Sequence, residues 1–95
     1  MANVSNNRSR SRTEIVTQIL EVAALNRSGE GATKTSIMYK VFLNYEQLKE
    51  YLILLTQNDL LYHDKTMGTF KTTEKGLLLL QAYKQIDQML KEQHC

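Results

Sequence analysis

The sequence has little cysteine and no long hydrophobic run. Its single cysteine, Cys95, is the last residue, so no disulfide can form within the chain and nothing indicates an oxidising compartment. The longest apolar runs, 51–55 and 77–80, are far shorter than the roughly 20 residues of a membrane-spanning helix, and there is no signal-type leader. We therefore predict a cytoplasmic protein that has no membrane partner.

Motifs for catalysis are also missing. The sequence contains no glycine-rich phosphate loop, no nucleophile motif and no pair of carboxylates in a recognisable pocket. The soft metal ligands are His63, His94 and Cys95, which lack the spacing of a zinc site, and we expect His63 to be partly buried and hydrogen-bonded in a strand. The prediction is a protein that is not an enzyme and has no metal and no cofactor.

Positive charge is concentrated at the N-terminus. Lys and Arg outnumber Asp and Glu by only 12 to 10, but Arg8, Arg10 and Arg12 all precede the first acidic residue, Glu14. Residues 1–11 contain too little apolar surface to offset the entropy of ordering them, so we predict a flexible basic arm. The whole chain, with 95 residues and 42% hydrophobic content, is long enough for one compact domain.

Helical periodicity begins directly after this arm. Apolar residues recur at helical spacing over 12–26, and Thr13 with its neighbours offers a start for this first helix. A loop rich in glycine and serine follows, and Thr33 is then a good N-cap for a second helix that extends to about Phe42. The residues that this second helix should bury are Ile37, Met38 and Val41.

A third helix follows after a very short turn. Asn44 and Gln47 have the spacing of a capping box, which predicts that the helix begins at Tyr45 and continues to about Asn58. Its apolar stripe consists of Leu48, Tyr51, Leu52 and Leu55.

The remaining third of the chain reads as a hairpin and a long helix. Residues 60–64 and 69–73 are strand-like, and Gly68 between them can supply the positive φ that a tight turn requires. Thr73 is placed to cap a fourth helix over 74–92.

The order helix, helix, helix, hairpin, helix indicates an α+β, mostly helical fold of the winged helix-turn-helix type. It has three helices, a two-stranded wing and a long C-terminal dimerisation helix. In this arrangement the third helix enters the major groove of DNA and the hairpin lies along the backbone. We accordingly divide the chain into a basic arm (1–11), a winged helix-turn-helix domain (12–73) and a dimerisation helix (74–95), and predict binding to double-stranded DNA.

The outward face of the third helix carries the candidates for base contacts. Gln47 can pair with adenine, Lys49 can reach guanine or phosphate, and Tyr45 can touch a backbone oxygen. Glu46 and Glu50 on the same face would repel phosphates unless one of them accepts a hydrogen bond from cytosine.

The start of the second helix and the hairpin are predicted to contact phosphates, and the arm to enter the minor groove or follow the phosphates. The alternatives are ordinary capping for the helix start, a solvated turn for the hairpin tip, and a basic tail without a specific role for the arm. The complete set of predicted DNA-binding residues is Arg8, Arg10, Arg12, Lys34, Thr35, Ser36, Lys40, Tyr45, Gln47, Lys49, Lys65, Thr66 and Lys71. If about five basic groups neutralise phosphates, log K should fall against log salt with a slope of about −4 to −5 per protomer.

The fourth helix should be about 28 Å long, more than a body of this size covers along its whole length. Its apolar residues have the spacing of a coiled-coil seam, which predicts a homodimer. Packing back onto the first helix of the same chain is the alternative. The predicted dimer interface consists of Leu79, Tyr83, Ile86, Met89 and Leu90.

Three segments in this order resemble one known family. They are Gly31-Ala32-Thr33-Lys34-Thr35-Ser36-Ile37-Met38-Tyr39-Lys40, then Asn44-Tyr45-Glu46-Gln47-Leu48-Lys49-Glu50-Tyr51-Leu52, then Lys71-Thr72-Thr73-Glu74-Lys75-Gly76. Together they resemble the archaeal ArnR-like winged-helix family, which is similar to the small archaeal ten-kilodalton chromatin-type proteins. The resemblance covers about residues 13–92 and implies a nucleoid-associated, DNA-binding homodimer joined by an antiparallel C-terminal coiled coil, with a role in transcription regulation or in chromatin.

The chain departs from that family at two places. Gln57-Asn58-Asp59 stands where a Lys-Gly or similar turn usually ends the third helix, and the arginine-rich arm is an addition. The main rival hypothesis is a winged helix that binds another protein and not DNA, which would explain Glu46, Glu50 and an exposed Ile53 on the outward face. Salt-dependent DNA binding would separate the two hypotheses.

Overall fold

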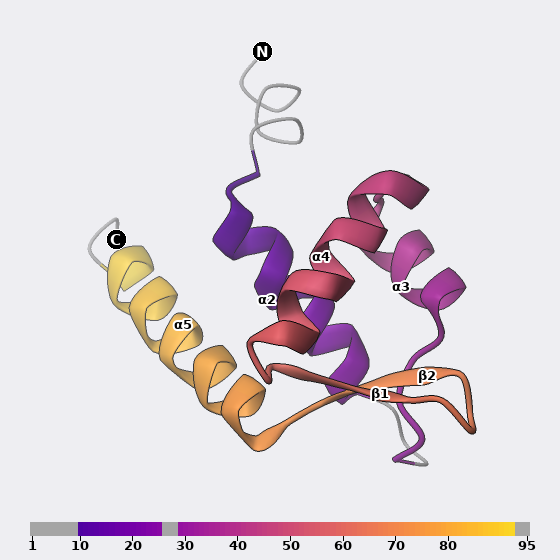
Figure 1. The fold of residues 1–95 in the computed structure, drawn as a ribbon. Coiled ribbons are helices and arrows are strands. Elements are labelled where there is room, and N and C mark those ends of the chain that lie inside the picture. Colours follow the sequence, from indigo (N-terminus) through magenta and orange to yellow (C-terminus); the bar gives the residue numbers. More distant parts are fainter. Residues whose placement is uncertain (1–9, 26–28, 93–95) are drawn as a thin grey trace.

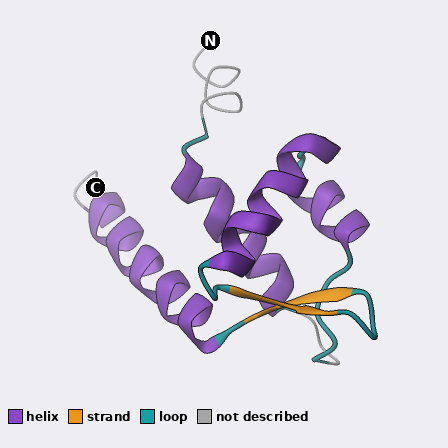
Figure 2. Ribbon diagram, in the orientation of Figure 1, coloured by secondary structure: helices purple, strands orange, loops and turns teal. Residues whose placement is uncertain are grey.

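The computed structural model describes residues 10–25 and 29–92, and it confirms the predicted order of elements (Figures 1 and 2). Helices and a two-stranded antiparallel sheet form the winged helix-turn-helix arrangement. The elements are α2 (Arg12–Ala24), α3 (Lys34–Val41), α4 (Tyr45–Gln57), β1 (Leu61–Asp64), β2 (Thr69–Thr72) and α5 (Glu74–Glu92).

The first of these helices, α2, begins at a different cap from the one expected near Thr13. The backbone N–H of Glu14 donates to Ser11 Oγ at 3.1 Å, and the N–H of Ser11 donates to Glu14 Oε1 at 2.9 Å. This reciprocal pair is a capping box, and it satisfies two amides that the first turn of a helix would otherwise leave unpaired. Ser11 and the preceding Arg10 therefore belong to the folded domain, although the sequence placed both in the arm.

The turn between α3 and α4 is as short as predicted, and the predicted N-caps of both helices are confirmed. Thr33 Oγ1 accepts from the N–H of Ser36 at 3.1 Å, and Asn44 forms a capping box with Gln47. Phe42 closes α3 in the left-handed conformation, with φ 60° and ψ 50°. Glycine or asparagine usually takes this place because a β-carbon is disfavoured there. The reversal lets α4 start only four residues after α3 ends.

The two predicted strands pair as an antiparallel hairpin, with Leu61 opposite Thr72 and Asp64 opposite Thr69. Gly68 has the expected positive φ, +69°. A further pairing was not predicted: Ala32 and Phe70 exchange backbone hydrogen bonds of 2.9 and 2.8 Å, which attach the segment before α3 to β2. Gly31 permits this approach, because a β-carbon there would lie 2.5 Å from the carbonyl oxygen of Phe70.

The core fills the space among α2, α3, α4 and the hairpin. The stripes predicted for α3 and α4 are confirmed in it, although Met38 and Tyr51 are only half-buried at its edge. The largest fully buried side chains are Ile19, Leu20, Ile37, Val41, Leu48 and Leu55. The face of α4 that faces away from this core therefore remains available for contacts outside the domain.

Helix α5 has the predicted bounds, and the N–H of Gly76 donates to Thr73 Oγ1 at 3.0 Å, as expected for a cap. The part of α5 up to Lys84 packs on the domain: Leu80 is buried, Leu79 is half-buried, and Lys84 forms a 3.4 Å ion pair with Glu21 of α2. The C-terminal end of the helix extends away from the other elements (Figure 1).

Candidate nucleic-acid interface

One surface depression joins α3, α4 and the wing. Lys34 at the start of α3, Tyr45 and Lys49 on α4, and His63 on β1 all line it. Lys34, Tyr45 and Lys49, which were each predicted to contact DNA, are thus brought together beside the exposed face of α4. We call the depression and the exposed face of α4 next to it the α4 surface.

The most central cation of the α4 surface is Lys49. Its ammonium lies 5.6 Å from the centre of the Tyr45 ring and 4.0 Å from a carboxylate oxygen of Glu46, with about half of the side chain exposed. An ion pair this long and this exposed contributes little to stability. Lys49 is therefore free to leave Glu46 for a phosphate or a base.

The side chain of Gln47 already has a structural task. Its Oε1 accepts from the N–H of Asn44 at 3.1 Å, while the N–H of Gln47 donates to Asn44 Oδ1 at 2.8 Å. Pairing with adenine needs both the amide oxygen and the amide nitrogen. Gln47 could make that pair only if its oxygen accepted a second hydrogen bond.

The start of α3 presents donors and a cation to solvent. Lys34 and Thr35 are exposed, and no hydrogen bond to their amides is formed within residues 10–25 and 29–92. The amide of Ser36, by contrast, is taken by Thr33, and its side chain is half-buried on the side that faces Lys40. Lys34 and Thr35 are thus better placed than Ser36 for an anion at the positive end of the helix dipole.

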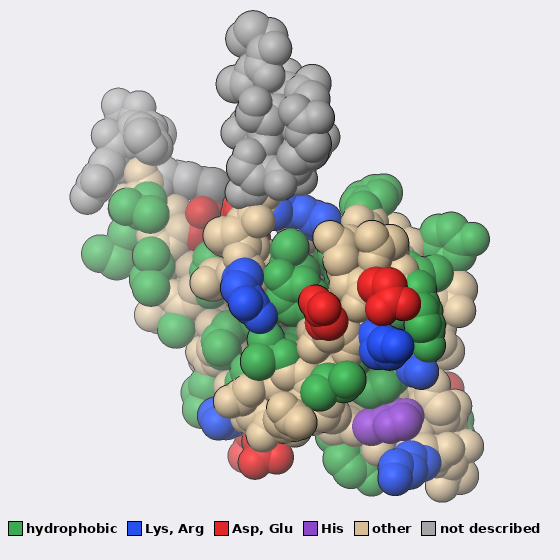
Figure 3. All heavy atoms as spheres, turned by 45° about the horizontal axis from the view of Figure 1, so that its top comes forward, with side chains coloured by type: hydrophobic (Ala, Val, Ile, Leu, Met, Phe, Trp, Pro, Cys, Tyr) green, Lys and Arg blue, Asp and Glu red, His purple; other side chains and the backbone are tan. Residues whose placement is uncertain are grey.

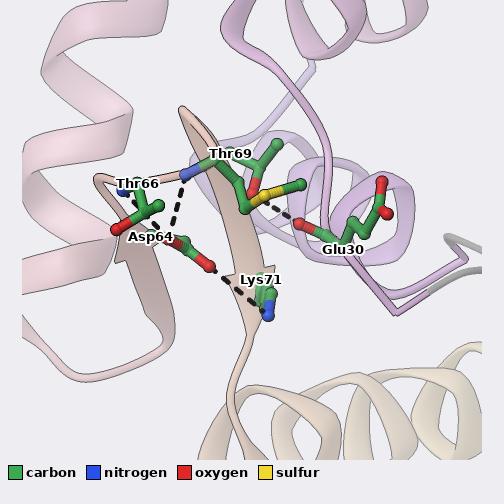
Figure 4. Close-up of polar contacts among 6 residues, drawn as sticks. Glu30, Asp64, Thr66, Thr69 and Lys71 are labelled. Carbon is green, nitrogen blue, oxygen red and sulfur yellow. Dashed lines mark hydrogen bonds and ion pairs between the residues drawn. The ribbon is translucent and has the colours of Figure 1, made fainter.

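The wing turn is organised by Asp64, a residue that the sequence analysis did not single out (Figure 4). Its Oδ1 accepts from the N–H groups of Thr66 and Met67, both at 3.1 Å. Its Oδ2 lies 3.6 Å from Lys71 Nζ. Aspartate side chains often accept hydrogen bonds from the amides two and three residues later and so stabilise a turn. An aspartate at the end of a predicted strand could therefore have indicated this role from the sequence.

The predicted wing residues therefore separate into two groups. Lys65 and Thr66 are exposed in the turn. Lys71 is paired with Asp64 and points to the other face of the hairpin from Phe70, because successive strand residues alternate in direction. Lys71 lines a depression with Ala23, away from α4.

Arg10, the arginine of the predicted arm that the structure describes, is bound to the domain itself. Arg10 donates to Gln18 Oε1 at 2.5 Å and to the carbonyl oxygens of Val41 and Phe42 at 2.9 and 3.5 Å. It satisfies carbonyl groups at the end of α3, where a cation is also favoured by the helix dipole.

The remaining cations lie apart from the α4 surface or outside the described residues. Arg12 lies 5.8 Å from the centre of the Tyr51 ring and lines a groove beside α5. Lys40 lies next to Arg10, near Phe42. Arg8 lies outside the described residues.

Charges of both signs mix on this side of the molecule. Figure 3 shows basic, acidic and hydrophobic side chains interspersed, with no continuous basic patch on the face in view. Glu46 and Glu50 are exposed on α4, as the sequence predicted. Any attraction for DNA must therefore come from a few placed lysines, because the overall field of this face is not strongly positive.

The predicted dimer residues divide along α5. Leu79 packs against the chain's own core and Tyr83 is half-buried. Farther along, Ile86, Met89 and Leu90 remain 57%, 63% and 54% exposed. A groove between α2, α4 and α5 continues this apolar surface inward, with Val16 and Leu54 among its lining residues.

Within residues 10–25 and 29–92, no three His, Cys, Asp or Glu side chains come close enough to hold a metal ion. His63 is half-buried, as expected, but among the described residues it stacks on Phe70, with ring centres 4.3 Å apart and planes 6° from parallel, and does not form the expected hydrogen bond. His94 and Cys95 lie outside the described residues. The described helices include none long and apolar enough to cross a bilayer.

Comparisons with known proteins agree with this architecture. Residues 9–91 match a family model described as winged helix-turn-helix. No curated protein matches the chain.

Proposed function

This chain belongs to the winged helix-turn-helix family, and from that premise we propose that it binds double-stranded DNA as a homodimer. In this proposal α4 lies in the major groove and the 65–68 turn of the wing lies along the sugar-phosphate backbone. The role is that of a transcriptional regulator or a chromatin-type protein of archaeal type in the cytoplasm.

The observation that carries the proposal is the convergence of Lys34, Tyr45 and Lys49 on one depression beside the exposed face of α4. These residues come from two helices and were each expected to contact DNA for a separate reason. The exposed turn with Lys65 lies at the end of the hairpin that forms the other side of this depression. Lys34, Lys49 and Lys65 are then the phosphate contacts, and Tyr45 contacts a backbone oxygen.

The homodimer is supported by the end of α5. Three large apolar side chains that are each more than half exposed on one projecting helix are unfavourable in water, and a second copy of the helix would cover them. Two α4 helices on one face of a dimer would fit two successive major grooves, about 34 Å apart.

The test is a fluorescence-anisotropy titration of a random-sequence duplex at several salt concentrations. Each of Lys34→Gln, Lys49→Gln and Lys65→Gln should weaken binding and make the slope of log K against log salt shallower by about 1. Lys40→Gln is the matched control, because Lys40 lies near Arg10 and apart from the α4 surface. Equal effects of all four variants would mean that the α4 surface is not the interface.

A second candidate function is supported by exposed aromatic residues. Tyr39, Phe42 and Tyr45 are 73%, 81% and 52% exposed, and Ile53 on α4 is 50% exposed. Such side chains are typical of the centre of a protein–protein interface. A winged helix that binds a protein partner and not DNA would show no binding to the duplex even at low salt.

A further inference from the structure

We propose that the depression on the α4 surface is a binding site for a small aromatic carboxylate of one or two rings. The site was not apparent in the sequence, because its floor and walls come from α3, α4 and both strands of the wing. It accounts for two features that DNA binding leaves unexplained, the exposed Ile53 and the position of His63.

The floor of the site is apolar and firmly held. Leu48, Leu52 and Phe70 line it, and each is at most 4% exposed because its other side belongs to the core. Ile53 forms part of the wall. A preformed apolar concavity with a few polar groups at its edge is the general form of a small-molecule site.

The size of the depression limits the ligand. Its volume is about 200 Å³. That is smaller than the roughly 300 Å³ at which sites for drug-sized ligands begin, and larger than the roughly 150 Å³ engineered cavity that admits benzene. One ring or two fused rings fit this range.

Aromatic side chains favour a flat ligand. His63 stacks on Phe70 at 4.3 Å, and both rings line the site, with Tyr45 on another side. Aromatic rings attract one another in stacked and edge-to-face arrangements at centre distances of about 4.5–7 Å. An aromatic ligand can meet these walls in either arrangement.

The cations at the edge favour a negative charge. Lys34 and Lys49 line the same depression, and no ion pair to Lys34 is formed in the part of the chain that the structure describes. Lys34 is also the first residue of α3, so the positive end of that helix dipole adds to the field. A single carboxylate between the two lysines complements this charge, whereas a neutral ring does not.

Such a ligand should oppose DNA binding. It would occupy Lys34, Tyr45 and Lys49, the residues that the proposed function assigns to the DNA backbone, so the two ligands would exclude each other. This consequence rests on the proposed function, whereas direct binding of the carboxylate does not. At a ligand concentration ten times its Kd, competition would lower the affinity for DNA about elevenfold.

The direct test uses 1-naphthoate as the probe and ¹H–¹⁵N NMR titration of the full chain. We expect saturable shifts at residues around the depression and at least about fivefold weaker binding of the neutral 1-naphthalenemethanol, a ratio worth about one exposed ion pair. The double variant Lys34→Gln/Lys49→Gln should lose the preference for the carboxylate. Thr56→Leu, which adds bulk at the lining, should lose both ligands while keeping the dispersed spectrum of a folded chain.

Lys65→Gln separates the two proposals, because Lys65 lies on the wing turn and does not line the depression. It should weaken DNA binding and leave naphthoate binding unchanged. Equal affinity for the acid and the alcohol, shifts centred elsewhere, or no saturation would overturn the ligand site. Naphthoate binding without competition against DNA would retain the site and contradict DNA binding at the α4 surface.

Discussion

Gly76, in the first turn of α5, lies where the helix crosses the start of the hairpin. A β-carbon at this position would lie 2.5 Å from the carbonyl oxygen of Leu60 and 2.6 Å from Thr72 Cγ2. The first of these is a backbone atom, so the clash cannot be relieved by rotating a side chain. This contact sets how closely α5 approaches the domain.

We therefore expect Gly76→Ala to lower the free energy of unfolding by about 1–3 kcal/mol, the usual range for overpacking. In an open helix the same change would stabilise by up to about 1 kcal/mol. Urea denaturation followed by circular dichroism measures the difference. Gln81→Ala, at an exposed position of the same helix, is the control and should stay within about 0.5 kcal/mol of the parent. A stabilised Gly76→Ala would contradict this packing.

At the scale of elements, α5 is a helix with two environments. Leu80 and the Lys84–Glu21 pair fix the helix to the domain as far as Lys84, whereas the apolar residues Ile86, Met89 and Leu90 are largely exposed. The part of α5 up to Lys84 therefore packs on α2 of the same chain, as the alternative prediction had it. The exposed apolar residues beyond Lys84 support the proposed dimer. One amphipathic seam serves both purposes because the helix extends beyond the body it packs on.

Replacing Ile86, Met89 and Leu90 together with serine should convert the proposed dimer to a monomer that remains folded, since none of the three is buried in the protomer. Sedimentation equilibrium gives the oligomeric state, and circular dichroism the helix content. The matched control replaces Gln81, Gln85 and Gln88 with serine. These residues are exposed on the same helix, so this variant has a similar loss of helix propensity but should keep the oligomeric state of the parent. A seam variant that sediments as a dimer would contradict the proposed interface.

At the scale of the whole molecule, the charge balance of 12 basic to 10 acidic residues gives no strong general attraction to DNA. Of the cations proposed from the sequence, Arg10 and Lys71 are engaged by groups of the chain itself, and Arg12 and Lys40 lie away from the α4 surface. Among the residues that the structure describes, Lys34, Lys49 and Lys65 of each protomer remain at the proposed interface. The affinity should then depend on two protomers acting together.

Three phosphate contacts give a slope of log K against log salt of about −3 for one protomer and about −5 to −6 for a dimer on one duplex. We expect the wild-type chain to show the steeper slope and the monomeric seam variant about half of it, with much lower affinity. Anisotropy titrations at matched salt concentrations measure both. The same slope for the two proteins would show that each protomer binds alone.

The sequence by itself determined the order of the helices and strands and, to within about two residues, their bounds. Caps and turns such as Thr33, Asn44, Gly68 and Thr73 act on neighbours within a few residues, so local chemistry is enough to place them. The cap of the first helix is the exception: it is Ser11, whose capping box with Glu14 spans the expected Thr13. The same local rules identified the apolar stripes that fill the core.

Only the tertiary structure decided which polar and charged residues share a surface. Arg10 reaches the end of α3, Ala32 pairs with Phe70, and Lys34 meets Lys49 beside the wing, all across many positions of the chain. Sequence periodicity shows on which face of a helix or strand a residue lies. Which other helix or strand packs against that face depends on how the core is packed. That packing assigned Arg10 and Lys71 to the chain's own carbonyl and carboxylate groups, and it brought Lys34 and Lys49 to the α4 surface.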